Sequence, residues 1–176
     1  MFVPEIEKLL NEQVGHEFYS AYLYLSMSAW LRDKHLDGYA QWFYVQYKEE
    51  MDHGLMMYNY ILNAGGQVAL GPIEAPPQEF DSVEDVLRRS LEHEQLVTAL
   101  IYKILAAAHA VNDFKTAQFL DWFVQEQVEE EDNAATSLGR LQKFGGDPAT
   151  LYSLDREYAA RVYTPTPQLA LYEAAG

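Results

Sequence analysis

Residues 50–53 read Glu50-Met51-Asp52-His53, and Glu17 stands 33 residues before the first of them. The same spacing of 33 residues separates Glu94 from the run Gln127-Val128-Glu129-Glu130. Residues three positions apart share one face of an α-helix, so each run offers two polar side chains to the same neighbour. A carboxylate from one helix and two such ligands from the next form half of a metal site in a four-helix bundle. Two halves predict two metal ions held side by side.

Apolar periodicity and capping residues divide the chain into helices and connections. We expect long helices over residues 6–31, 39–64, 82–111 and 114–144, and a shorter fifth helix that starts at 148 and ends near 163. Asp37-Gly38 is expected to break the first helix from the second, and Gly65-Gly66 to end the second. Residues 67–81 contain three prolines and predict an extended connection.

The pattern of short, long and short connections has a topological meaning. Short links join antiparallel neighbours, whereas the long middle link lets the third helix run parallel to the second. Fifteen extended residues reach about 50 Å, and a helix of 28 residues is roughly 42 Å long, so the link can span the bundle. The predicted fold is all-α, a four-helix bundle with a long crossover between the second and third helices and a short fifth helix.

Composition excludes several classes of function. A formal net charge of −15 argues against a nucleic-acid partner, since a phosphate backbone needs a basic surface. No apolar run approaches 20 residues, so no membrane span is expected. The start of the chain lacks the pattern of a secretory signal, which favours a cytoplasmic protein. The absence of cysteine removes disulfides and thiolate metal sites.

Each long helix carries an inward stripe that is apolar at its ends and polar near its middle. The polar positions include Glu17, Glu50, His53, Glu94, Gln127 and Glu130. Burying several carboxylates together is expensive, and no Lys or Arg lies on these stripes to offset the cost. Cations can offset it. An oxygen-rich ligand set with one imidazole suits iron, manganese or zinc.

Several motifs occur in an order and spacing that resemble the bacterial non-haem ferritins over residues 1–163. These motifs are Asn11-Glu12-Gln13, Ser28-Ala29-Trp30, Glu49-Glu50-Met51, His93-Glu94-Gln95 and Glu126-Gln127. The resemblance implies a ferritin-like di-iron domain over 1–163 and a homo-oligomeric, hollow shell of 24 copies that stores ferric mineral. Residues 164–176, which begin with Thr-Pro-Thr-Pro, are expected to form a largely disordered tail.

The resemblance also implies roles for individual residues. By position, Glu17, Glu50 and His53 would hold one iron, with Glu50 bridging to the second. The second iron would be held by Glu94 and Glu130, with Gln127 as a hydrogen-bonding partner or weak ligand. The remaining acids, with Glu130 shared, resemble a third iron site on the cavity side: Glu49, Glu126 and Glu129.

The implied activity is that of a ferroxidase. Two Fe(II) ions would each give one electron to dioxygen or peroxide, and Tyr24 resembles the redox-active tyrosine of the family. The other reading of Tyr24 is an ordinary core tyrosine. Met51 stands where bacterioferritins place a haem ligand, but those proteins carry Glu-x-x-His in the fourth helix, so haem is not expected. His16 and His93 lie off the inward stripe and are expected to be outer-face or second-layer groups.

Alternatives remain open at this level. A structural shell subunit could mineralise iron without fast oxidation, although such a subunit would be expected to lose some of the carboxylates. A di-iron peroxidase or electron-transfer protein of the rubrerythrin kind usually has cysteine ligands, which this chain lacks. Multi-component oxygenases need longer chains. The acids of the three-fold channel of animal ferritins are replaced by Ala117 and Leu120, with Asp121 a partial substitute, so the route of iron uptake is open.

Overall fold

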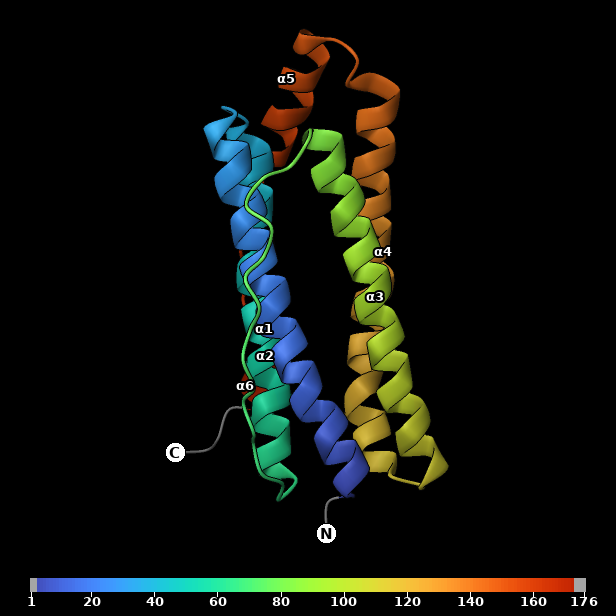
Figure 1. Ribbon diagram of the computed structural model, residues 1–176. Coiled ribbons are helices and arrows are strands. Elements are labelled where there is room, and N and C mark those ends of the chain that lie inside the picture. The colour runs from blue at the N-terminus through green and yellow to red at the C-terminus, as the bar shows by residue number, and fades with distance from the viewer. Residues whose placement is uncertain (1–2, 173–176) are drawn as a thin grey trace.

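The computed structural model describes residues 3–172, and this part of the chain is helical without strands (Figure 1). Four long helices are followed by two short ones: α1 Pro4–Asp33, α2 Asp37–Asn63, α3 Val83–Ala110, α4 Phe114–Phe144, α5 Pro148–Tyr158 and α6 Pro167–Tyr172. The expected all-α fold, with a long crossover and a short fifth helix, is confirmed. Within residues 3–172, no helix has the length and apolarity needed to cross a membrane.

The bundle consists of two helical hairpins. α1 packs mainly on α2 and α3 mainly on α4, while α1 and α3 make a smaller contact. The extended connection between α2 and α3 runs along the bundle, so these two helices point the same way (Figure 1). Side chains of α1 hold the connection in place: Asn11 Nδ2 donates to the Gln67 carbonyl at 3.0 Å, and Ser26 Oγ donates to the Pro77 carbonyl at 2.6 Å.

Helix starts follow the expected capping chemistry. Ser82 caps α3 by accepting a hydrogen bond from the Asp85 amide, and Asp113 caps α4 by accepting one from the Thr116 amide. Asp147 accepts from two amides at the start of α5. Each cap satisfies amides that the first helical turn leaves without an intrahelical partner.

Gly38 allows close packing of two helices, whereas the sequence predicts that it breaks the first helix from the second. α1 ends at Asp33 and α2 already begins at Asp37, so Gly38 lies inside the first turn of α2. A Cβ atom on Gly38 would collide with the backbone carbonyl of Asp155 in α5. The Asp155 carboxylate also accepts a hydrogen bond from the Tyr39 amide at 2.9 Å. Glycine is needed here because α5 lies directly against the start of α2.

The chain after α5 differs from the prediction in two ways. The fifth helix ends at Tyr158, not near Tyr163, because the next residues extend along α2, where Arg161 and Tyr163 bind side chains of that helix. Part of the tail expected to be disordered forms α6. The rest of that tail, residues 173–176, lies outside the described residues.

Aromatic packing holds α6 on the bundle. The ring of Tyr172 lies 5.0 Å from that of Phe119 and 6.2 Å from that of Tyr60, and Asn63 Nδ2 donates to the Tyr172 carbonyl at 3.1 Å. Aromatic packing favours an ordered α6, which composition alone does not predict.

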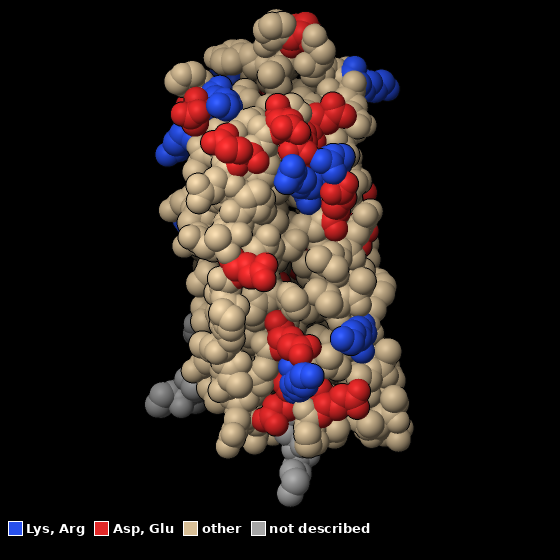
Figure 2. All heavy atoms as spheres, viewed as in Figure 1, with Lys and Arg blue, Asp and Glu red and all other residues tan. Residues whose placement is uncertain are grey.

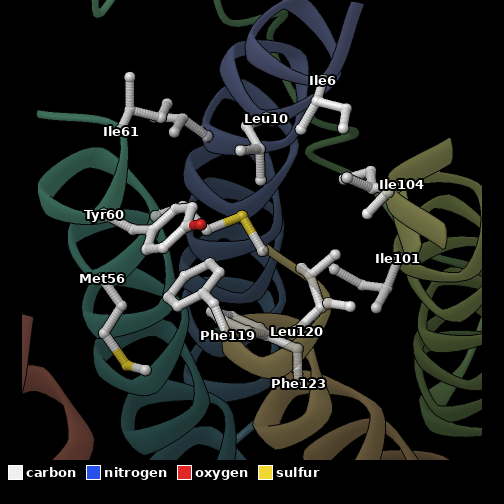
Figure 3. Close-up of a cluster of buried hydrophobic side chains, with 14 of the residues drawn as sticks. Ile6, Leu10, Met56, Tyr60, Ile61, Ile101, Ile104, Phe119, Leu120 and Phe123 are labelled. Carbon is white, nitrogen blue, oxygen red and sulfur yellow. The ribbon is translucent and has the colours of Figure 1, made fainter. Parts of the chain in front are cut away.

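Two apolar clusters fill the interior, one toward each end. The lower cluster, at the end of the bundle where α1 begins, includes Leu10, Met56, Tyr60, Ile101 and Phe119 (Figure 3). Tyr60 stacks on Phe119 there, with ring centroids 3.9 Å apart. The upper cluster contains members from the other end of each long helix, among them Met27, Phe43, Leu87 and Leu141. In all four helices most of the buried residues between the two clusters are polar. The bundle therefore has a buried polar layer between two apolar ones.

Candidate metal centre

The first hairpin contributes one imidazole and two carboxylates to the polar layer. Glu17 comes from the middle of α1, and Glu50 and His53 lie one turn apart on α2; all three are buried. One ligand atom from each lies within 4.8 Å of the other two. His53 Nδ1 is 3.3 Å from Glu50 Oε2. The spacing of three residues on one helix and a third ligand from its neighbour produce the predicted half-site.

The second hairpin contributes Glu94 from α3 and Gln127 and Glu130 from α4, all buried. The Gln127 amide donates to Glu94 Oε2 at 3.1 Å and to the Glu94 carbonyl at 3.2 Å. The amide nitrogen thus faces Glu94, so Gln127 orients that carboxylate through hydrogen bonds. After burial, the charge of Glu130 raises the pKa of Glu50, and the charges of Glu50 and Glu130 raise the pKa of Glu94, so acids of the two half-sites interact electrostatically.

Two glutamines that the sequence analysis did not assign to the site support its carboxylates. Gln13 Nε2 donates to Glu17 Oε1 at 3.0 Å, and Gln46 Nε2 donates to Glu50 Oε1 at 3.2 Å. Each glutamine stands four residues before its carboxylate, one helical turn away. The signal was present in the sequence, because both glutamines lie on the inward stripes. One oxygen of each carboxylate is held in this way, while Glu50 Oε2 faces His53.

Burial and mutual repulsion favour protonation of these carboxyl groups. Burial, followed by the charge of Glu50, raises the pKa of Glu17 to about 8. Burial, followed by the charge of Glu130, raises the pKa of Glu50 to about 8. The pKa values of Glu94 and Glu130 are raised chiefly by burial as well. The bundle therefore concentrates acids that need a positive charge beside them before they ionise at neutral pH.

The protein does not provide that charge from its own buried side chains. Among residues 3–172, no lysine or arginine is buried. On the face shown in Figure 2, basic and acidic side chains lie near one another at the surface. Four carboxylates and one imidazole fit hard or borderline divalent cations such as Fe(II), Mn(II) and Zn(II). The donor set thus has the chemistry of a two-metal site assembled from four helices.

Comparison with known proteins agrees with this geometry. A family model of the ferritin-like domain matches residues 7–144. The bacterial non-heme ferritin of Staphylococcus saprophyticus is 39% identical over 163 residues, covering 93% of this chain and 98% of that protein.

The chain belongs to the ferritin family.

Other relatives and solved structures extend the similarity. The bacterial non-heme ferritin of Staphylococcus haemolyticus is 36% identical over 163 residues, covering 93% of this chain and 98% of that protein. The open pore ferritin of Archaeoglobus fulgidus superposes with a TM-score of 0.91 at 38% identity, covering 92% of this chain and all of that one. A humanized archaeal ferritin gives a TM-score of 0.92 at 36% identity, over 94% of this chain.

In this ferritin Tyr24 is completely buried beside the second half-site. Its hydroxyl donates a hydrogen bond to Glu94 Oε1. Burial, and then the neighbouring Glu94 charge, raise the pKa of Tyr24 well above its usual value, so the phenol keeps its proton. The ring lies 5.7 Å from Phe43 and 5.9 Å from His93. Tyr24 therefore combines core packing with direct contact to a ligand.

The three acids of the predicted third site lie farther out. Glu49 and Glu126 are half-buried, and Glu129 is exposed. Burial raises the pKa of Glu49 and of Glu126. The charge of Glu130 raises that of Glu126 further, and the charge of Glu49 raises that of Glu130, so the outer acids interact electrostatically with the buried centre. Glu49 is ion-paired with Arg161, a residue that the sequence analysis did not connect with the site. We refer to Glu49, Glu126 and Glu129 as the outer acidic group.

The remaining candidates lie away from the centre. His16 is exposed, as expected for an outer-face group, whereas His93 is half-buried behind Tyr24, with Nε2 2.7 Å from Ser20 Oγ, as expected for a second-layer group. Ala117 and Leu120 are buried in the lower apolar cluster, and Asp121 is exposed. Of these three residues, only Asp121 is open to cations in the isolated chain.

Proposed function

We propose that this ferritin is a ferroxidase that oxidises Fe(II) at the buried centre and stores the ferric product. One observation supports the proposal above all others. Glu17, Glu50 and His53 are buried within reach of one cation, the buried Glu94 and Glu130 interact electrostatically with Glu50, and no lysine or arginine among residues 3–172 is buried with them. A subunit that only formed a shell would gain nothing from keeping such an unfavourable group of acids. The family membership supports iron as the metal.

Iron is the substrate in this proposal, and the ligands of the chain determine how it is bound. Glu17 and His53 would bind one ion, Glu94 and Glu130 the other, and Glu50 would bridge them because it faces acids from both hairpins. Two Fe(II) ions each lose one electron, and dioxygen takes up both. Carboxylate oxygens favour the harder Fe(III) over Fe(II), so they favour the oxidised pair.

Proton release accompanies the uptake of metal. Glu17 and Glu50 are mostly protonated at neutral pH in the metal-free chain, because their pKa values are about 8. A cation can use their oxygens fully only after those protons leave. Gln13 and Gln46 keep the freed carboxylates in place by continuing to donate to one oxygen of each.

Product transfer and storage complete the proposal. The outer acidic group would accept iron after it leaves the buried centre. Twenty-four copies of the chain would surround a cavity for the mineral, an assembly that the resemblance to ferritins implies; membership of the ferritin family supports a homo-oligomeric shell. Gln127 would make the second half-site less charged than the first, which favours release of the product over its retention.

The test is oxygen-dependent oxidation of Fe(II) by the assembled, metal-stripped protein at two irons per subunit. The parent should oxidise this iron rapidly, and Glu50→Ala should lose the fast phase because the bridge is gone. Glu12→Gln, a change at an exposed acid of α1, serves as the matched control. Equal, slow oxidation by the parent and Glu50→Ala would rule out a catalytic centre and leave a passive storage shell.

A further inference from the structure

Arg161 lies in the segment between α5 and α6 and reaches the outer acidic group. Its guanidinium forms an ion pair with Glu49 Oε2 and donates to Gln46 Oε1 at 2.8 Å. The side chains of Arg161 and Glu49 retain only 17% and 23% of their exposure, respectively. An ion pair shielded to this extent is screened by solvent far less than a surface pair. A fixed positive charge therefore lies against one oxygen of the Glu49 carboxylate.

The same guanidinium is connected to the buried centre through one glutamine. Gln46 accepts from Arg161 with its oxygen and donates to Glu50 with its nitrogen, at 2.8 and 3.2 Å. The positive charge of Arg161 also lowers the pKa of Glu126 and of Glu130, although burial keeps both values raised. Arg161 thus acts on the bridging carboxylate and on the acids around it.

The backbone around Arg161 is held firmly against α2. Gln41 Nε2 donates to the Arg161 carbonyl at 3.2 Å, and the guanidinium lies 4.0 Å from the ring centroid of Trp42. Two residues later, the Tyr163 hydroxyl donates to Asp52 Oδ2 at 2.8 Å. These contacts fix the backbone and the guanidinium of Arg161, so its positive charge is held beside Glu49.

We propose that Arg161 is a built-in counter-cation of the outer acidic group, and that a metal ion binds Glu49 only by displacing the guanidinium. The inference rests on the proposed function, because it describes how iron would leave the buried centre. An arginine and a divalent cation cannot occupy the same carboxylate oxygens at close range, since their charges repel each other. Arg161 is a positioning residue that sets the affinity of the outer group and so the direction of iron transfer.

The consequence for the metal is a graded affinity. The buried centre has no basic competitor, whereas the outer group has one. Cations should therefore fill the buried centre first and occupy the outer group only at higher concentration. A weakly held outer ion is suited to onward transfer, and release of that ion lets Arg161 return to Glu49.

Zinc binding by isothermal titration calorimetry tests this proposal without any redox step. The assembled, metal-stripped protein should show a tight class of sites that Glu50→Ala abolishes, and a weak class that Glu49→Gln abolishes. In Arg161→Gln, the weak class should tighten by at least about tenfold, or become measurable where the parent shows none, because the competing charge is gone. The affinity of the tight class should change much less than that of the weak class, because Arg161 contacts the buried centre only indirectly, through Gln46.

Two further variants separate charge from structure. Arg140→Gln removes an arginine that pairs with Glu157 away from the centre, and it should leave both classes as in the parent. Arg161→Lys keeps the charge and should keep the weak class weak. Unchanged or weaker outer binding in Arg161→Gln would overturn the inference, as would equal tightening in Arg161→Lys or Arg140→Gln. Persistence of the tight class in Glu50→Ala would instead refute the proposed centre.

A zinc-loaded crystal of the unmutated protein gives an independent test that does not depend on how the variants fold. Zinc bound at Glu49 should coincide with an Arg161 guanidinium more than 4 Å from that carboxylate. A zinc ion on Glu49 with the ion pair still intact would overturn the inference.

Discussion

Replacement of Glu17 by glutamine should make the metal-free protein more stable at neutral and alkaline pH. Glu17 is 1% exposed, and its pKa rises from 4.5 to about 8 on folding. Because the folded state holds the proton more tightly than the unfolded state, stability is lost as pH rises from 4.5 to 8. Glutamine has no such proton, yet its oxygen can still accept the hydrogen bond from Gln13.

The magnitude follows from the size of the shift. At 1.36 kcal/mol per unit of pKa, Glu17 costs the metal-free protein about 3 kcal/mol at pH 7 and about 5 kcal/mol above pH 8. At pH 5 the free energy of unfolding of Glu17→Gln should therefore be close to that of the parent. At higher pH it should exceed the parent's value by about these amounts.

Urea denaturation in the presence of a chelator, at fixed protein concentration and across pH 5 to 8.5, measures this difference. Glu12→Gln is the control, because Glu12 is exposed and its pair with Lys8 at 3.7 Å is a surface interaction. Parallel pH profiles for the parent and Glu17→Gln would refute the reasoning. With saturating Zn(II) the order should reverse, since the variant then lacks a ligand.

Three other changes test separate features. Gly38→Ala should destabilise the protein by about 1–3 kcal/mol and loosen α5, because the new methyl group meets the Asp155 carbonyl; calorimetry would measure this, and an unchanged melting temperature would contradict it. Tyr24→Phe should cost about 1 kcal/mol and slow iron oxidation while zinc affinity is preserved; stopped-flow kinetics with parallel titration would separate the two, and an unchanged rate would assign Tyr24 to packing alone. Gln127→Glu should raise zinc affinity about tenfold and lower metal-free stability at pH 8, since a carboxylate replaces the donor to Glu94; weaker zinc binding in calorimetry would argue against it.

The sequence was sufficient for features that depend on local periodicity. The helix starts at Ser82 and Asp147 follow from capping chemistry within a few residues. Glu50 and His53 could be assigned to one site because a spacing of three residues places both on the same side of a helix. Such features need no knowledge of what lies across the bundle.

Features that depend on contacts between distant segments could not be read in advance. Arg161 meets Glu49 across 112 residues of sequence, and nothing near either residue signals the pairing. The sequence around Gly38 indicates only a helix break. The constraint that requires glycine there, the carbonyl of Asp155, comes from another helix. The order of α6 likewise depends on rings of α2 and α4 that composition cannot reveal.

The division of the bundle into two hairpins has a thermodynamic consequence. Glu17, Glu50 and His53 belong to α1 and α2, whereas Glu94 and Glu130 belong to α3 and α4. A pair of ions shared between these sets would cross-link the two hairpins. The binding free energy of the ions would then oppose separation of the hairpins more strongly than it opposes unfolding of a single hairpin. A ligand at 100 times its dissociation constant adds about 2.7 kcal/mol. The concentration of available iron would thus determine how often the two hairpins separate, and with it the lifetime of the folded subunit.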